Sequence, residues 1–379
     1  MNETDSPHGS VALDLRTPCD KLPTTSCYSN GSREDLKAIG NSSGNLPVFG
    51  ELLDAEMEVN PMKLREASRA GIPPLYRGTV YRYLLGVSFV DKSCEMTMER
   101  MQEKDFEQLE ATFAQIVSSD EQGAIKRCAA SQILCATNSE QLLTRKESKF
   151  ANGSRCSDRS SSFGYTTWLA ILSQIRYMPQ FVTNHDRRQR MESAWRALQV
   201  SHADASSDEV NCIFELALAF DAVYTNARDI YFSVESLHHL LSHNNNVLQS
   251  KQCLQQQCGM FLMLFRATNF ELYRHFVTEG VSVLEWVPGM LTTLLAGRLH
   301  VDDLLCLWDV YFADALEYLG FPLHPYVCLA ILVQMTEVLI ECEKSGIIEL
   351  LHHLPRIRTP SIVQRAIALR ESVLSQGLV

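Results

Sequence analysis

The stretch Phe270-Glu-Leu-Tyr-Arg-His-Phe276 decides the fold, together with Trp286 and Leu307-Trp308-Asp309, which follow it. Its apolar side chains recur at the spacing of an amphipathic helix. Trp286 and Trp308 are interpreted as core aromatics, since such side chains bury a large area when helices pack. Asp309 is interpreted as the partner of a backbone group or of a buried arginine such as Arg77. The stretch therefore predicts consecutive packed helices.

The same periodicity extends in both directions along the chain. A helix is expected to start at Asn60-Pro61, because proline suits the first helical position. Further helices are predicted at 75–87, 95–117, 124–143, 165–176, 188–200, 210–224, 229–243, 250–266, 270–278, 284–297, 302–313, 325–343, 345–353 and 360–375. No segment shows the sustained period-two alternation of strands. The fold class is therefore predicted as all-α.

Two polar stretches set the predicted domain limits. Residues 1–50 are rich in Ser, Thr, Asn, Gly, Pro and Asp, a composition that predicts a disordered tail. Residues 51–376 are predicted to form one large helical domain. Within it, the Ser/Arg/Gly-rich residues 146–164 predict a flexible loop.

Composition limits the classes of function. The chain has 379 residues, 46% of them hydrophobic, and a net charge of −11, which argues against a general nucleic-acid binder. The 12 cysteines are scattered without a C-x-x-C pair, which favours reduced thiols in a cytoplasmic protein. The longest apolar run, 326–340, is too short to span a membrane. No glycine-rich phosphate loop is present, so no cofactor is predicted.

Two clusters of polar side chains are interpreted as surface residues that form no site. His239 and His243 are four residues apart beside His238, but no H-E-x-x-H pattern accompanies them, so no metal site is predicted. The segment Arg187-Arg188-Gln-Arg190 is basic and could contact an acidic partner or lipid. A solvated helix face is the favoured interpretation of this segment.

The order of these motifs resembles the TBC-domain family of Rab GTPase-activating proteins. Gly71-Ile-Pro, Arg77 and the run Val80-Tyr-Arg-Tyr-Leu-Leu-Gly86 are similar to the family's opening motif, with Tyr81 where tryptophan is usual. The block 270–309 is similar to its second half. The resemblance covers about 71–357 and implies an all-α TBC domain in which Arg77, Trp286, Trp308 and Asp309 are structural.

The resemblance also implies a function. It implies a regulator of a small Rab-like GTPase in vesicle trafficking, cytoplasmic and peripheral on endomembranes only through its partners. Active members of the family give the GTPase an arginine from I-x-x-D-x-x-R and a glutamine from Y-x-Q. An arginine finger is generally worth about 10³–10⁵ in rate, because its guanidinium neutralises charge on the transferred phosphoryl group.

Both catalytic motifs are altered in this chain. The best match to the first, Val117-Ser-Ser-Asp120-Glu-Gln-Gly123, keeps the aspartate and has glycine in place of the arginine finger. Arg127 lies about one helical turn further on, ~6 Å of rise, and is a weak substitute finger. Tyr177-Met-Pro-Gln180 is one residue longer than Y-x-Q, which makes Gln180 a weak match.

Two hypotheses of function follow. In the first, the chain is a GTPase activator that acts in trans, without catalytic chemistry of its own, and uses Arg127 or Arg77 at the phosphate. In the second, it is a scaffold TBC module without fingers that binds helical or coiled-coil partners. Its layout is similar to that of the small TBC-domain subunit of the tuberous sclerosis complex. Gly123 favours impaired or absent catalysis, since glycine has no side chain to stabilise phosphoryl charge.

Overall fold

The computed structural model describes residues 46–119, 184–243, 251–315 and 320–376. Helices follow one another throughout these ranges. The β-pairing found among the described residues is a single isolated bridge between Glu58 and Asp91. The predicted all-α class is confirmed. The helices are α2 (Leu46–Leu53), α3 (Pro61–Ser68), α4 (Pro74–Leu84), η2 (Lys92–Cys94), α5 (Glu95–Ser119), α10 (His185–Ser201), α11 (Ser207–Asp221), α12 (Ala227–His243), α13 (Lys251–Thr268), α14 (Phe270–Thr278), η3 (Val283–Glu285), α15 (Val287–Thr292), α16 (Val301–Asp314), α17 (His324–Gln334), α18 (Thr336–Ile340), α19 (Lys344–His352) and α20 (Thr359–Ser375).

Helix starts follow from local side-chain chemistry. The Asn60 side chain accepts hydrogen bonds from the backbone N–H groups of Met62 and Lys63, both at 3.1 Å, and Pro61 is the first residue of α3. The helix predicted at 270–278 is α14, whose first turn is capped by Asn269. Because each cap fixes where its helix begins, the starts of both helices lie close to the predicted ones.

Two predicted helices are interrupted in the structure. The helix predicted over 284–297 is η3 followed by the short α15, and the chain then turns through Leu294 and Leu295, whose φ angles are 49° and 67°. Both leucines are fully buried, so the apolar pattern continues while the backbone leaves the helix. The helix predicted over 325–343 is divided at Met335 into α17 and α18.

The tail predicted over 1–50 overlaps α2, which begins at Leu46. The helices predicted at 124–143 and 165–176, and the loop predicted at 146–164, lie outside the described residues.

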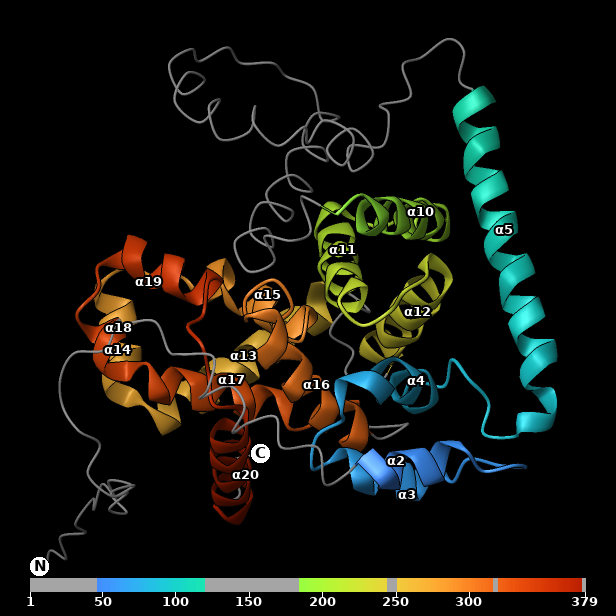
Figure 1. Cartoon of the computed structure of the whole chain (residues 1–379). Coiled ribbons are helices and arrows are strands. Elements are labelled where there is room, and N and C mark those ends of the chain that lie inside the picture. The colour runs from blue at the N-terminus through green and yellow to red at the C-terminus, as the bar shows by residue number, and fades with distance from the viewer. Residues whose placement is uncertain (1–45, 120–183, 244–250, 316–319, 377–379) are drawn as a thin grey trace, which may run out of the picture. The chain divides into compact units, whose positions relative to one another are not determined.

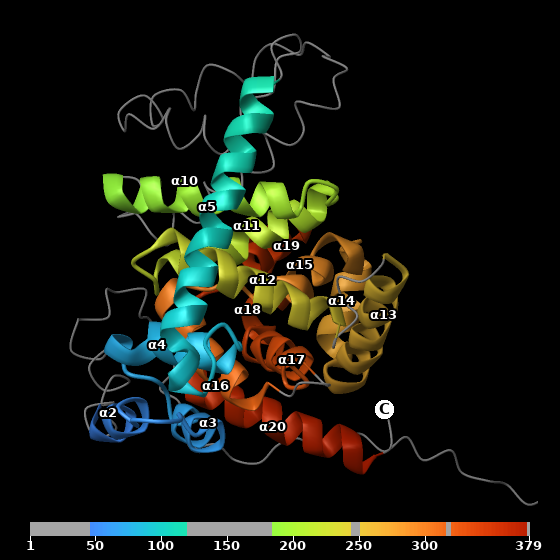
Figure 2. The same cartoon turned by 90° about the vertical axis from the view of Figure 1, so that its right-hand side faces the viewer.

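Two groups of helices position the sites described below. Helices α10, α11 and α12 contact one another, and the long α5 lies along α10 and α12 (Figures 1 and 2). Helix α16 contacts α3, α4 and α20, while α17 packs along α20 and also contacts α13 and α15. Segments from the first and last thirds of the chain therefore share one core.

Aromatic side chains dominate the centre of that core. The ring centroid of Trp308 in α16 lies 5.1 Å from that of Phe220 in α11 and 5.4 Å from that of Phe312. Tyr81 of α4 meets Phe312 edge-on at 4.7 Å. Contacts of this kind contribute beyond the area they bury, so they fix how α4, α11 and α16 pack. None of the helices described is long and apolar enough to cross a membrane.

Candidate functional site

A network of buried polar groups centred on Asp309 joins α4 to α16. The Arg77 guanidinium donates to both carboxylate oxygens of Asp309, at 2.9 Å each. The Tyr81 hydroxyl donates to the same carboxylate at 2.7 Å, and the Ile72 backbone N–H donates at 3.0 Å. The Asp309 side chain is 1% exposed and the Arg77 side chain 13%. Both partners considered from the sequence, a backbone group and Arg77, are thus bound to Asp309.

This network determines what Arg77 can do. Its Nη2 also donates to the Ile72 carbonyl at 3.1 Å, so the guanidinium is held inside the domain. Paired buried groups are costly to separate, and Arg77 is therefore not available as a finger at a bound phosphate. Trp286 and Trp308 are also fully buried, and Trp308 Nε1 donates to the Leu294 carbonyl at 3.2 Å.

The other catalytic residues considered from the sequence, Asp120, Gly123, Arg127 and Gln180, lie in 120–183, outside the described residues. The next described residue is Asn184, which caps the first turn of α10.

Two arginines of α10 hold a buried carboxylate. Arg187 Nε lies 2.7 Å from Asp221 Oδ2, and Arg190 Nη2 lies 2.7 Å from Asp221 Oδ1. The Asp221 carboxylate is fully buried, and the two arginine side chains are 18% and 15% exposed. The interpretation of this segment as a solvated face was therefore wrong for Arg187 and Arg190. No motif or spacing predicts this pairing, because Asp221 lies at the far end of the next helix.

A cavity of about 600 Å³ opens between α11, α13, α15 and α19. Its charged lining combines four carboxylates with a lysine and an arginine: Asp208, Glu209, Glu215, Glu285, Lys251 and Arg298. The excess of carboxylates suits a cationic group better than a phosphate.

Two groups of opposite charge, the half-buried Glu215 and the buried Arg298, give this cavity its electrostatic character. Burial raises the pKa of Glu215 to about 7, and the charge of Arg298 acts against this rise. Burial lowers the pKa of Arg298, which donates from Nη1 to the Leu351 carbonyl at 3.0 Å and lies 3.1 Å from His352 Nδ1. Gly289 leaves the room that the guanidinium needs, since a Cβ there would lie 2.0 Å from Arg298 Nη2.

Sequence reasoning did not single out this cavity. One signal was present, because Glu215 interrupts the apolar run of α11 between Phe214 and Leu216. A carboxylate in such a run needs a partner or a proton. Arg298 comes from a distant part of the chain, and its spacing from Glu215 carries no motif.

Comparison with known proteins finds a family match within the helical core. A family model described as the Rab-GTPase-TBC domain matches residues 208–340. GTPase-activating protein gyp1 of Schizosaccharomyces pombe is 26% identical over 163 residues, which are 42% of this chain and 30% of that protein. TBC1 domain family member 5 homolog A of Dictyostelium discoideum is 30% identical over 134 residues, 34% of this chain and 10% of that protein. The chain thus matches less than a third of the length of either relative.

A solved structure extends the likeness in fold. The crystal structure of the Ypt/Rab-GAP domain of Gyp1p superposes with a TM-score of 0.53 at 16% identity, over 89% of this chain and 98% of that one. At this identity the match concerns the fold alone. It covers most of that domain, including parts outside residues 208–340.

Proposed function

We propose that the chain, whose residues 208–340 match the Rab-GTPase-TBC domain model, is a TBC-domain protein that binds a Rab-type small GTPase and regulates it with little or no finger catalysis. The observation that carries the binding half of this proposal is the family match over 208–340. The names of the matched proteins, a GTPase-activating protein and a Ypt/Rab-GAP domain, give the class of partner.

The second half of the proposal, weak catalysis, rests on two residues. Gly123 stands where the family motif has its arginine, and glycine cannot place charge beside a phosphoryl group. Arg77, the other arginine considered, donates to Asp309 from both Nε and Nη2. Arg127 is the remaining arginine near the motif.

Binding is tested with the full chain and a panel of Rab proteins, each loaded with GDP or with a non-hydrolysable GTP analogue. The proposal expects at least one Rab to bind more tightly in the GTP-like state. It also expects Arg127→Ala to leave that affinity within about threefold, because a side chain without a role at the phosphate contributes little to binding. Arg69→Ala, at a 60% exposed arginine, is the matched control. Failure of every Rab to bind in either state would overturn the proposal.

A second candidate, a scaffold for a helical partner, is favoured by exposed apolar side chains on two contacting helices. Met263 of α13 is 65% exposed, and Phe270 and Val277 of α14 are 57% and 60% exposed. Exposed apolar side chains on neighbouring helices suit the apolar face of a partner helix. This candidate expects Met263→Asp to abolish capture of a helical partner, while Leu75→Asp, at a 77% exposed position of α4, does not.

A further inference from the structure

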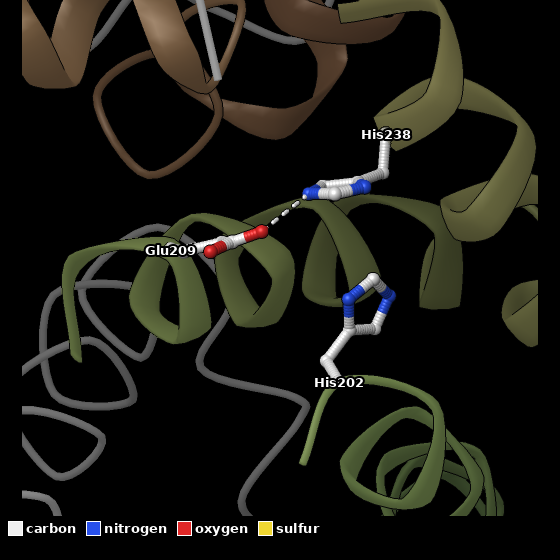
Figure 3. A group of neighbouring side chains, drawn as sticks. All are labelled: His202, Glu209 and His238. Atoms are coloured by element: carbon white, nitrogen blue, oxygen red, sulfur yellow. Dashed lines mark hydrogen bonds and ion pairs between the residues drawn. The ribbon is translucent and has the colours of Figure 1, made fainter. Parts of the chain in front are cut away.

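Three side chains lie close together: His202, which follows α10, Glu209 of α11 and His238 of α12 (Figure 3). The atoms that each could offer to a metal ion all lie within 4.8 Å of one another. His238 Nε2 is already 3.2 Å from a Glu209 carboxylate oxygen. The two imidazole rings meet edge-on with centroids 4.7 Å apart.

The backbone holds each of these residues on a packed element. His202 is the residue that ends α10, and its N–H donates to the Leu198 carbonyl at 2.9 Å. Glu209 lies in the first turn of α11, which Ser206 caps. His238 lies on α12, and the three helices contact one another in pairs. Sites built on packed helices hold their geometry better than sites on loops.

A fourth residue orients His202. Its Nε2 lies 2.9 Å from a carboxylate oxygen of Glu235 on α12. A histidine that binds a metal through one ring nitrogen usually has the other held by a carboxylate, which fixes the ring and raises its basicity. Glu235 therefore leaves Nδ1 of His202 as the ligand atom.

We propose that His202 Nδ1, His238 Nε2 and the Glu209 carboxylate bind one divalent transition-metal ion of the Zn²⁺ class. Two imidazoles and one carboxylate are a ligand set that Zn²⁺ accepts, with the fourth position left for water. Zn²⁺ bonds of about 2.0–2.1 Å place tetrahedral ligand atoms ~3.4 Å apart. The contact between His238 and Glu209 is close to this length at 3.2 Å, and the ligand atoms of all three residues already lie within 4.8 Å of one another.

Burial, charge and access agree with a bound cation. The side chains of His202 and His238 are 14% and 13% exposed, and those of Glu235 and Glu209 are each 29% exposed. A metal ion binds imidazoles in their neutral form, and the two carboxylates then leave an excess of negative charge that a divalent cation offsets. Glu209 also lines the 600 Å³ cavity, which gives an ion a path from solvent.

The test uses the full chain, stripped with a chelator, kept reduced and titrated with Zn²⁺ against a chromophoric competitor. We expect one equivalent bound by the wild type. The variants His238→Asn and Glu209→Gln should weaken its Kd at least ~10-fold, and Glu235→Gln by ~10–100-fold, as for other residues that orient metal ligands. His239→Asn is the matched control, because His239 is the exposed neighbour of His238 and not part of the cluster; it should bind Zn²⁺ as the wild type does.

Co²⁺ gives a second readout, because thiolate ligands produce a charge-transfer absorption that imidazole and carboxylate ligands lack. We expect tetrahedral Co²⁺ bands without that absorption, and their loss in Glu209→Gln. Circular dichroism checks the fold of each variant, and Glu235→Gln, which keeps all three ligands, tests the site if a ligand variant does not fold. Equal Zn²⁺ affinity in the wild type, Glu209→Gln and Glu235→Gln would overturn the proposal, as would a thiolate band in the Co²⁺ spectrum.

Discussion

Replacing Asp309 with alanine removes one acceptor on which three donors depend. Arg77, Tyr81 and the Ile72 N–H all donate to this carboxylate, which is 1% exposed. The substitution leaves the buried Arg77 guanidinium without its charged partner, with only the Ile72 carbonyl as acceptor, while the Tyr81 hydroxyl keeps the Leu305 carbonyl at 3.0 Å. Breaking such a buried ion pair costs about 3–5 kcal/mol. We therefore expect the free energy of unfolding to fall by about 4 kcal/mol.

The matched control is Asp314→Ala, on the same helix. Asp314 pairs with Arg69 at 2.7 Å, but these side chains are 40% and 60% exposed. Solvent screens such a pair, so its loss should cost about 0–1 kcal/mol. Urea unfolding followed by far-UV circular dichroism measures both variants, and a lower midpoint at an unchanged slope reports lost stability. Equal free energies of unfolding for Asp309→Ala and Asp314→Ala would mean that no stabilising buried network joins α4 to α16.

Two further changes test the cavity. Gly289→Ala should cost about 1–3 kcal/mol in a thermal or urea melt, because its Cβ would lie 2.0 Å from the Nη2 atom of the held Arg298. Gly259→Ala, with nothing within 4 Å, should instead stabilise α13 by about 0.5–1 kcal/mol; equal effects would refute the close approach. Burial holds the pKa of Glu215 at about 7 against an ordinary 4.5, so the native state binds this proton more tightly than the unfolded state does. The wild type should therefore lose at most about 3 kcal/mol as the pH rises from 4.5 to 7. Glu215→Gln should lack this loss, and pH profiles that coincide for the two proteins would contradict the burial of a carboxylate there.

The sequence was most informative where local and long-range preferences agree. Helix α14 has an asparagine cap, an apolar face and a following break, and its limits were predicted closely. The turn at Leu294 and Leu295 was missed, because buried leucines there continue a helical pattern. What turns the backbone is tertiary, including the hydrogen bond from Trp308 to the Leu294 carbonyl.

The side-chain clusters were less accessible to sequence reasoning. Arg77 was predicted as a possible partner of Asp309 because a buried aspartate needs a backbone group or an arginine beside it. His238 was instead weighed with its sequence neighbours His239 and His243, whereas the fold brings it to His202 and Glu209. Proximity of this kind depends on how α10, α11 and α12 pack, and no spacing in the chain encodes it.

The central claim, a TBC domain without an arginine finger at residue 123, is tested most directly by single-turnover GTP hydrolysis. The substrate is the GTP-loaded Rab that the full chain binds, at saturating concentrations of the chain. We predict less than about a tenfold acceleration by the wild type, where an arginine finger gives ~10³–10⁵. Acceleration of about 10³-fold or more that is lost in Arg127→Ala and kept in Arg69→Ala would contradict the account and make Arg127 the finger.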